Sequence, residues 1–253
     1  MDERRALVAV VKLGGSIVTD KTRDFTYRPE AVASIARAVR ASGVPVVVVH
    51  GGGSFGHPVA IRYGLSSRAP RASPEGVSET RRAMLDLNAR VCGSLTSEGL
   101  RPYTFTPFPL LEAAGRRGAA WLRDVVSAGL TPVTFGDVVH DAAGFRVLSG
   151  DTIALLLSKT LGAGRCVFVM DVDGVMGPRG LLRELDRSSA SRLELSGSRD
   201  ATGGIALKVA EALRIASSGT EVAFVSGFRP SELSKALKGL GFRGTKVRVP
   251  SRG

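Results

Sequence analysis

Two stretches of the sequence decide the fold: residues 7–16 read LVAVVKLGGS, and residues 44–57 read VPVVVVHGGGSFGH. Each is a run of apolar, mostly β-branched residues that passes directly into glycines, which is typical of a strand buried on both faces and followed by a tight loop. Residues 29–42 between them repeat apolar side chains at helical spacing, with Pro29 at the start and Gly43 directly after the end. This order predicts a parallel βαβ unit with both glycine loops at the carboxyl ends of its strands, where open α/β sheets bind ligands.

The rest of the chain continues the alternation of an α/β protein. Helices are predicted over residues 74–98, 119–128, 153–161, 205–217 and 231–240. Strands are predicted over residues 130–135, 167–170, 221–225 and 245–249. Two further strands, 138–140 and 145–148, are expected to form a β-hairpin that makes the sheet mixed. Because no repeat or flexible linker is visible, we predict one continuous sheet shared by two lobes, residues 1–162 and 163–253, with a hinge near Gly162–Gly164.

The composition narrows the class of protein. The 253 residues are 43% hydrophobic and 23% charged, which excludes disordered, collagen-like and disulfide-scaffold chains. Lys and Arg number 35 against 23 Asp and Glu, and the resulting net charge of +12 suits either a nucleic acid or a small anionic ligand. Because the basic residues are scattered and only three Tyr and one Trp offer stacking surfaces, we expect no nucleic-acid partner.

Cysteines and apolar runs bear on metal and membrane binding. Cys92 and Cys166 lie far apart and belong to no Cys/His cluster, so we expect reduced core thiols and no protein metal site. The early apolar run, residues 6–11, is too short for a signal sequence, and no run approaches the roughly 18 apolar residues of a membrane-spanning helix. We therefore expect a cytoplasmic protein without membrane association.

Glycine-rich turns are the main functional signal. Residues 14–16 (GGS), 51–53 (GGG), 150–151 (GD) and 203–204 (GG) stand at predicted helix starts, where unhindered backbone N–H groups can hold an anion. Each loop alone is also compatible with an ordinary tight turn, and none has the spacing GxxxxGK[ST] or GxGxxG. Four such turns in one chain favour a long polyanion that meets a second anion.

Lysines strengthen this hypothesis, because phosphoryl transfer requires positive charge on the phosphate oxygens rather than covalent chemistry. Lys12 ends the first buried strand, where a charge needs an anionic partner. Lys21 follows the first glycine loop, and Lys208 lies one turn into the helix after Gly204. Asp151 either orients these lysines or caps the helix that begins beside it.

The three histidines differ in their expected roles. His57 directly follows the second glycine loop and faces its mouth, whereas His50 ends a buried strand and His140 lies on the predicted hairpin. We expect His50 to be structural and His140 to lie on the surface. Because no GxSxG elbow, HExxH helix or Cys/His pair is present, hydrolase chemistry has no local support.

Five motifs together resemble the amino acid kinase family. They are residues 12–16 (KLGGS), 50–57 (HGGGSFGH), 149–154 (SGDTIA), 171–175 (DVDGV) and 202–208 (TGGIALK). Within that family, the Gly-Ser-Phe-Gly-His step ending at His57 is similar to isopentenyl phosphate kinases and, second, to fosfomycin kinases. The resemblance implies an open αβα sandwich with a largely parallel central sheet, an amino-terminal acceptor lobe, a carboxyl-terminal nucleotide lobe, and a homodimer.

The resemblance also implies roles for individual residues. Lys12, Lys21 and Lys208 would neutralise the transferring phosphoryl group, with Lys21 as the transition-state stabiliser and Asp151 orienting the lysines. ATP would contact Lys12, Gly14, Gly15, Ser16, Gly52, Asp171, Gly204 and Lys208. The phosphate of a small phosphorylated isoprenoid would be held by Gly51, Gly56, His57 and Gly150. Its apolar tail would lie among Met84, Leu87, Val91, Phe105 and Phe108, residues for which plain core packing is the alternative.

The implied reaction is phosphorylation of isopentenyl phosphate by direct in-line transfer from ATP in the alternative mevalonate pathway. A phosphomonoester is already largely a dianion at neutral pH, so it needs no general base, and His57 is expected to donate a hydrogen bond to it. Mg²⁺ would arrive with ATP, bound chiefly by phosphate oxygens. The alternatives are a kinase of another small anion such as fosfomycin, a non-catalytic nucleotide-binding module, and a nucleic-acid binder.

Overall fold

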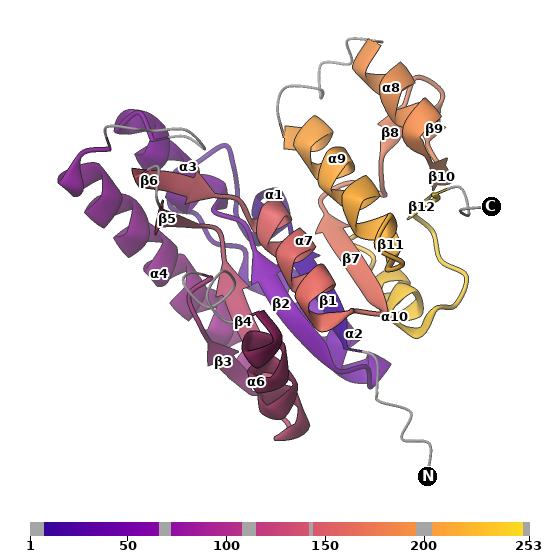
Figure 1. The fold of residues 1–253 in the computed structure, drawn as a ribbon, viewed down its shortest axis with the longest axis horizontal. Helices are drawn as coiled ribbons and strands as arrows, with labels where there is room; N and C mark the ends of the chain where they lie inside the picture. Colours follow the sequence, from indigo (N-terminus) through magenta and orange to yellow (C-terminus); the bar gives the residue numbers. More distant parts are fainter. Residues whose placement is uncertain (1–7, 66–71, 108–114, 142–143, 196–203, 250–253) are drawn as a thin grey trace.

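A computed structural model describes residues 8–65, 72–107, 115–141, 144–195 and 204–249. The strands of its central sheet are β1 (Ala9–Leu13), β2 (Val46–His50), β3 (Pro102–Thr104), β4 (Thr131–Phe135), β7 (Arg165–Met170), β10 (Glu184–Leu185), β11 (Glu221–Ser226) and β12 (Thr245–Val247). They form one eight-stranded sheet in the order β10-β12-β11-β7-β1-β2-β4-β3 (Figure 1). All paired neighbours are parallel except β11 and β12, so the sheet is largely parallel, as predicted.

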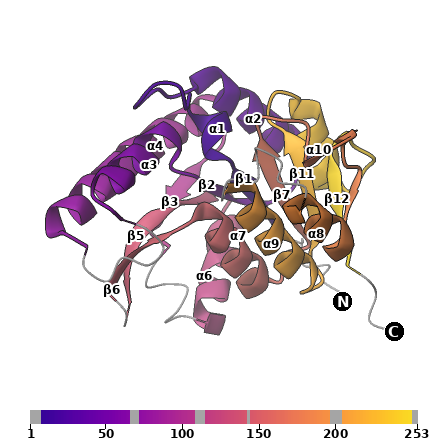
Figure 2. The same cartoon turned by 90° about the horizontal axis from the view of Figure 1, so that it is seen from above.

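Helices cover both faces of this sheet, which gives the α/β sandwich its layers (Figure 2). One face carries α2 (Pro29–Ser42), α4 (Pro74–Ser97) and α10 (Pro230–Lys238). The other face carries α6 (Gly115–Ser127), α7 (Gly150–Leu161) and α9 (Gly204–Ala216). Three further helices are α1 (Gly15–Val18), α3 (Gly53–Arg62) and α8 (Arg187–Leu195). Within the described ranges, no helix is long and apolar enough to cross a membrane.

The central strands are buried on both faces, which explains their continuous apolar sequences. In β1, Val11 packs into the core beneath α2, whereas Val10 packs into the core beneath α7. In β2, Val48 packs into the same core as Val11, and Val47 packs into the same core as Val10. Because successive strand side chains point to opposite faces, a strand between two helix layers must be apolar at every position.

Helix ends follow the signals in the sequence. α2 begins at Pro29 and ends before Gly43, which adopts the left-handed conformation with φ 66°. The Ser73 hydroxyl accepts the Gly76 amide and so caps α4, and Ser149 caps α7 in the same manner by accepting the Thr152 amide. The predicted helices and strands are therefore present, with ends that differ by a few residues.

One local prediction is wrong. The hairpin of β5 (Asp137–Asp141) and β6 (Gly144–Leu148) forms a separate two-stranded sheet, and the central sheet is mixed because of β12 instead. Outside the central sheet, the hairpin is bound by Arg81 of α4, which forms an ion pair with Asp137 and donates a hydrogen bond to the Val138 carbonyl. The glycines after β2 stand at a helix start, as the sequence predicted: α3 begins at Gly53, and only its extent was not given by the sequence.

Candidate active site

The carboxyl ends of the central strands lie side by side and form the floor of a cavity of about 530 Å³. Gly14 donates its amide to the Val169 carbonyl at 2.8 Å, and Gly51 donates to the Leu13 carbonyl at 3.0 Å. Gly136 continues the row by donating to the His50 carbonyl at 3.0 Å. The glycines that follow β1, β2 and β4 are thus brought together at one edge of the sheet, where ligands of such folds bind.

Two buried lysines share one carboxylate at the centre of the cavity. The Lys12 ammonium lies 2.5 Å from one Asp151 oxygen and the Lys208 ammonium lies 2.9 Å from the other. The three side chains are 5%, 15% and 10% exposed for Lys12, Lys208 and Asp151. Ser149, not Asp151, caps α7, so of the two sequence interpretations the orientation of lysines is the one that the geometry supports.

The charges of this trio set the pKa values of its members. Burial alone raises the pKa of the Asp151 carboxyl, but Lys12 and Lys208 outweigh it and lower the pKa to about 2. Burial and the nearby Lys12 ammonium lower the pKa of Lys208 to about 8, although Asp151 opposes them. Two positive charges against one negative charge leave the buried centre with a surplus of positive charge, which favours an anionic ligand.

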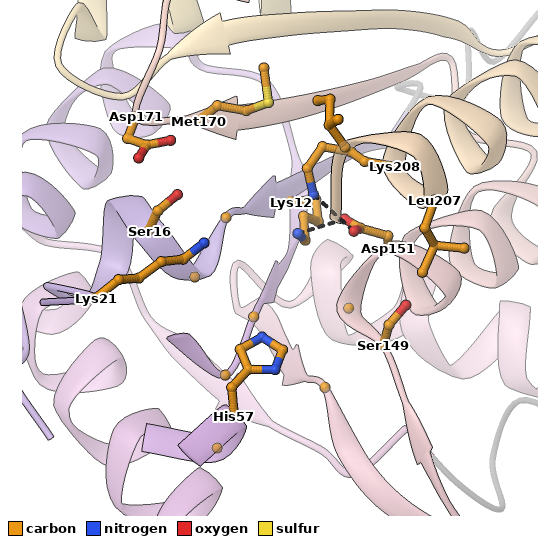
Figure 3. A pocket seen from close by; sticks show the side chains of 18 of the residues that line it. Lys12, Ser16, Lys21, His57, Ser149, Asp151, Met170, Asp171, Leu207 and Lys208 are labelled. Atoms are coloured by element: carbon orange, nitrogen blue, oxygen red, sulfur yellow. Dashed lines mark hydrogen bonds and ion pairs between the residues drawn. The ribbon is translucent and has the colours of Figure 1, made fainter. Parts of the chain in front are cut away.

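Lys21 reaches the same cavity from another direction. It lies in the exposed turn after α1, and its side chain points between Ser16 and His57 toward the Lys12–Asp151 pair (Figure 3). Among the described residues, no carboxylate forms an ion pair with it. An unpaired ammonium at this place is available to a phosphoryl oxygen.

The cavity has two distinct ends, with the lysines between them. Asp171 and Met170 lie at one end, and His57 lies at the opposite end (Figure 3). Partial burial and the neighbouring Lys21 and Lys12 lower the pKa of His57, which favours the neutral ring. A neutral imidazole still carries one N–H group and can donate it to an anion.

The structure brings nearly all of the predicted site residues together. The cavity is lined by Lys12, Gly14, Gly15, Ser16, Lys21, Gly51, Gly52, Gly56, His57, Gly150, Asp151, Asp171 and Lys208. Gly204 begins α9, the helix that carries Lys208, and residues 202 and 203 of the same motif lie outside the described residues.

Of the residues predicted to contact the apolar tail of the acceptor, only some line the cavity. Met84 lines the cavity, but Leu87 and Val91 are wholly buried in the core, and the buried Phe105 packs edge to face against Trp121. Core packing is therefore the correct interpretation for these three, and Phe108 lies outside the described residues.

Several lining residues were not predicted from the sequence. Thr80 of α4, Ala60 of α3, Val147 of β6 and Asp137, the first residue of β5, all line the cavity. Burial raises the pKa of the Asp137 carboxyl to about 6, against the opposing effect of Arg81. Asp137 stands directly after a buried strand and Gly136, the same signal that identified the other loops, whereas the other three carry no local signal.

The remaining histidines and the two cysteines lie outside the cavity lining, and His50 is buried and His140 exposed, as predicted. His50 is fully buried, stacks on Phe135 and contacts the Asn88 side chain, and burial lowers its pKa to about 4. His140 is exposed on β5. Burial raises the pKa of both cysteine thiols, that of Cys166 to about 12, so neither is a reactive thiolate.

Known proteins resemble this chain over nearly its whole length. The model of the amino acid kinase family matches residues 8–226. The isopentenyl phosphate kinase of Thermoplasma acidophilum is 33% identical over 249 residues, which cover 94% of this chain and 99% of that protein. The isopentenyl phosphate kinase of Methanothermobacter thermautotrophicus is 32% identical, with coverages of 94% and 98%.

Solved structures agree with the sequence comparison. A crystal structure of the T. acidophilum isopentenyl phosphate kinase product complex matches with a TM-score of 0.75 at 32% identity, covering 95% of this chain and 100% of that one. Its mostly parallel sheet between helix layers is the fold described above. Because these relatives are kinases, the protein is a phosphotransferase. The chain belongs to the amino acid kinase family.

Proposed function

We propose that this protein phosphorylates isopentenyl phosphate to isopentenyl diphosphate with ATP as the donor. The observation that carries the proposal is the placement of Lys12, Lys21 and Lys208 between the two ends of one cavity. Two polyanions that enter from opposite ends would meet at these ammonium groups. The names of the two relatives reported for the sequence comparison support the same substrate.

In this mechanism the ammonium groups bring two anions together. The acceptor phosphate attacks the γ-phosphorus of ATP in line, and the bond from that phosphorus to the bridging oxygen of ADP breaks. Lys12 and Lys208 would bind oxygens of the phosphates, held in place by Asp151. Lys21 would bind the transferring group, whose charge is most exposed in the transition state. No general base is needed, because the attacking phosphate is already a dianion.

The end near Asp171 fits a nucleotide triphosphate. The glycines after β1, Gly14 and Gly15, present backbone without side chains at the start of α1, beside Ser16. Val172 and Met176 supply apolar surface for a base beyond them. Among the described residues, no group of three or more His, Cys, Asp or Glu side chains could hold a metal ion. We therefore propose that Mg²⁺ is held mainly by the ATP phosphates.

The end near His57 fits a phosphate with a short apolar tail. Gly51, Gly56 and Gly150 border this end, and His57 can donate an N–H group to the acceptor phosphate. The tail would lie against an apolar wall of the cavity formed by Ala60, Met84 and Val147. An amino acid acceptor, with a second polar group, would leave that group unpaired against this wall.

The direct test is an ADP-release assay with MgATP and a panel of acceptors. The panel contains isopentenyl phosphate, dimethylallyl phosphate, geranyl phosphate, fosfomycin, glutamate and carbamate. We expect turnover with isopentenyl phosphate to exceed that with the others by at least about tenfold, equivalent to 1.4 kcal/mol of transition-state discrimination. Turnover with fosfomycin instead would assign another small-anion kinase, and silence with ATP bound would leave a nucleotide-binding module.

Replacing His57 by alanine is expected to lower acceptor-dependent kcat/KM by about a hundredfold, because the acceptor phosphate loses a hydrogen-bond donor in a dry site. ATP binding should survive, since His57 lies at the end opposite Asp171. Steady-state kinetics and calorimetric ATP titration measure the two effects. His140→Ala, at an exposed histidine of β5, is the matched control. Undiminished turnover of His57→Ala would remove the assigned role.

The pKa of Lys208, near 8, predicts a pH dependence. The free enzyme should lose kcat/KM for ATP above pH 8, by about tenfold per pH unit, as the ammonium deprotonates. Lys208→Arg should retain the charge and remove this decline, because arginine does not deprotonate in this range. A decline that persists in this variant would show that Lys208 is not the titrating group.

The stability of the fold should rise with pH over the range in which activity falls. The unfolded chain binds the Lys208 proton with a pKa of 10.5 and the folded chain with a pKa of about 8. Between these values the unfolded state holds more protons, so the contribution of Lys208 to the free energy of unfolding rises with pH. Urea denaturation at pH 8 and pH 10, compared for the wild type and Lys208→Arg, separates this stability effect from the loss of activity.

Further expectations from the resemblance stay predictions. We propose an acceptor lobe over residues 1–162 and a nucleotide lobe over residues 163–253, with strands of both in the continuous sheet. A homodimer, a cytoplasmic location and a place in the alternative mevalonate pathway complete the proposal. Light scattering of the purified protein measures the first of these, and product analysis in cells measures the last.

A further inference from the structure

A buried pair of hydroxyl groups joins the two glycine loops. Thr19 follows α1 and is fully buried, and Ser54 lies in the first turn of α3 and is 3% exposed. The Thr19 hydroxyl donates to the Gly15 carbonyl at 2.8 Å and accepts the Ser54 amide at 2.8 Å. One hydroxyl thus connects the loop after β1 with the loop after β2, which are 35 residues apart at this bond.

The same contact requires glycine on both sides. Gly53 has φ 47°, and a Cβ atom placed there would lie 2.7 Å from the Gly15 carbonyl oxygen and would collide with the Thr19 hydroxyl. A Cβ atom on Gly15 would lie 2.6 Å from the Gly53 nitrogen. The two loops are in direct backbone contact, so a displacement of either one must move the other.

Ser54 also anchors the turn that carries Lys21. Its hydroxyl accepts the Thr26 amide at 3.2 Å and its carbonyl accepts the Phe25 amide at 3.0 Å. The turn is closed at its base, where Asp20 donates its amide to the Thr26 carbonyl at 2.8 Å. Lys21 therefore sits in a closed turn whose far side is bonded to Ser54.

Phe25 shows that this attachment determines the conformation of the turn. It is the one non-glycine residue with positive φ among the described residues, at 52°, and it is 47% exposed. Its ring packs edge to face on the buried Phe55, with centroids 5.4 Å apart. A left-handed phenylalanine persists only where surrounding contacts hold it, here the bond to Ser54 and the ring of Phe55.

We propose that Thr19 and Ser54 are positioning residues that hold Lys21 at the transferring phosphoryl group. The inference deepens the proposed function and rests on it. The two hydroxyls touch neither end of the cavity, but they lock the first glycine loop, the second glycine loop and the Lys21 turn into one unit. The ammonium of Lys21 thereby keeps a set distance from phosphates bound at either loop.

The first test is a double-mutant cycle in steady-state kinetics. Ser54→Ala should lower kcat about tenfold, because small displacements of a positioned group have large effects on rate, and should leave both KM values near those of the wild type. In a Lys21→Ala background, the same substitution should change kcat by less than about twofold. Ser42→Ala, which removes a buried hydroxyl at the end of α2, is the matched control and should be silent.

A second pair of variants, at Thr19, separates an effect on catalysis from a loss of folded protein. Thr19→Ser retains the hydroxyl and should keep at least half of the wild-type kcat, whereas Thr19→Val should lose about as much as Ser54→Ala. If Ser54→Ala and Lys21→Ala combine additively, or if Thr19→Ser is as impaired as Thr19→Val, the positioning role is overturned and the hydroxyls only stabilise the fold.

Hydrogen exchange tests the same inference without substrate. The Thr26 amide loses its acceptor in Ser54→Ala and should exchange faster than in the wild type. The loosened turn should also speed exchange of the Phe25 amide, although its acceptor, the Ser54 carbonyl, remains, while the amides of β1 stay protected. Unchanged exchange at both amides would contradict the proposed anchoring even if the protein acts on a different acceptor. If isopentenyl phosphate is not the substrate, the wild type will show no turnover with it. The exchange result does not depend on substrate, so the two failures can be told apart.

Discussion

Lys21→Ala is expected to lower kcat by about a hundredfold to a thousandfold, with little change in the KM for ATP. The reason is that a preorganised charge aimed at the transferring group acts mainly on the transition state. Lys12 and Lys208 are already paired with Asp151, whereas no described carboxylate pairs with Lys21, so its charge is available to the phosphoryl oxygens. Single-turnover kinetics with saturating MgATP measure the chemical step directly.

The control for this prediction separates position from net charge. Lys238→Ala removes the same charge from an exposed site at the end of α10 and should leave kcat unchanged. The free energy of unfolding should change by less than about 0.5 kcal/mol in both variants, because both side chains are exposed. A drop of equal size in both variants, or a rise in KM alone, would contradict a role in the transition state.

Asp151→Asn is expected to lower both turnover and stability. The pKa of about 2 means that the folded protein gains from the ionised carboxylate, and this gain corresponds to about 2–3 kcal/mol at pH 7. The substitution leaves Lys12 and Lys208 close together without their shared counter-charge, and buried charges that lose a partner are strongly destabilising. Because the same lysines would then lose their orientation, kcat should fall by about a hundredfold.

The pH dependence of the stability difference between the wild type and Asp151→Asn identifies the cause of that difference. A group with a lowered folded pKa contributes stability that is present above its unfolded pKa, 3.8, and is lost as the pH falls through about 2. The difference between wild type and Asp151→Asn in urea denaturation should therefore be full at pH 7 and shrink below pH 3.8.

Asp173→Asn supplies a matched control for this substitution. Asp173 also binds two cations, Arg229 and Arg243, but at an exposed surface where ion pairs contribute about 0–1 kcal/mol. An effect of Asp173→Asn as large as that of Asp151→Asn would contradict the importance of burial.

The fold was largely predictable because its signals are local. The apolar runs of β1 and β2 predict strands buried on both faces, and the proline and glycine around α2 predict its ends. Local signals failed at the β5–β6 hairpin, which lies outside the central sheet, and they gave only the start of α3. The glycines of α3 disfavour a helix unless packing supplies the stability. The hairpin is bound by Arg81, which is 57 residues away from the carbonyl that it binds, so no local pattern shows this contact.

The candidate site was predictable to the same extent. Glycines and lysines at strand and helix ends are visible in the sequence, and the rule that ligands bind at the carboxyl ends of parallel strands places them at one edge. Whether Asp151 caps its helix or pairs with lysines was open, because both are compatible with its position beside Ser149. The ion pairs with Lys12 and Lys208 decide it, and they depend on how α7 and α9 pack on the sheet.

By itself, therefore, the sequence determined the order of strands and helices, the glycine loops and the lysines that a phosphoryl-transfer site needs, since each of these depends on residues that are close together in the chain. The tertiary structure alone decided which of these groups meet: Asp151 with Lys12 and Lys208, and Ser54 with Thr19 and the Lys21 turn. These contacts join residues far apart in the chain, and their distances are set by close packing of helices on the sheet, which no local pattern encodes.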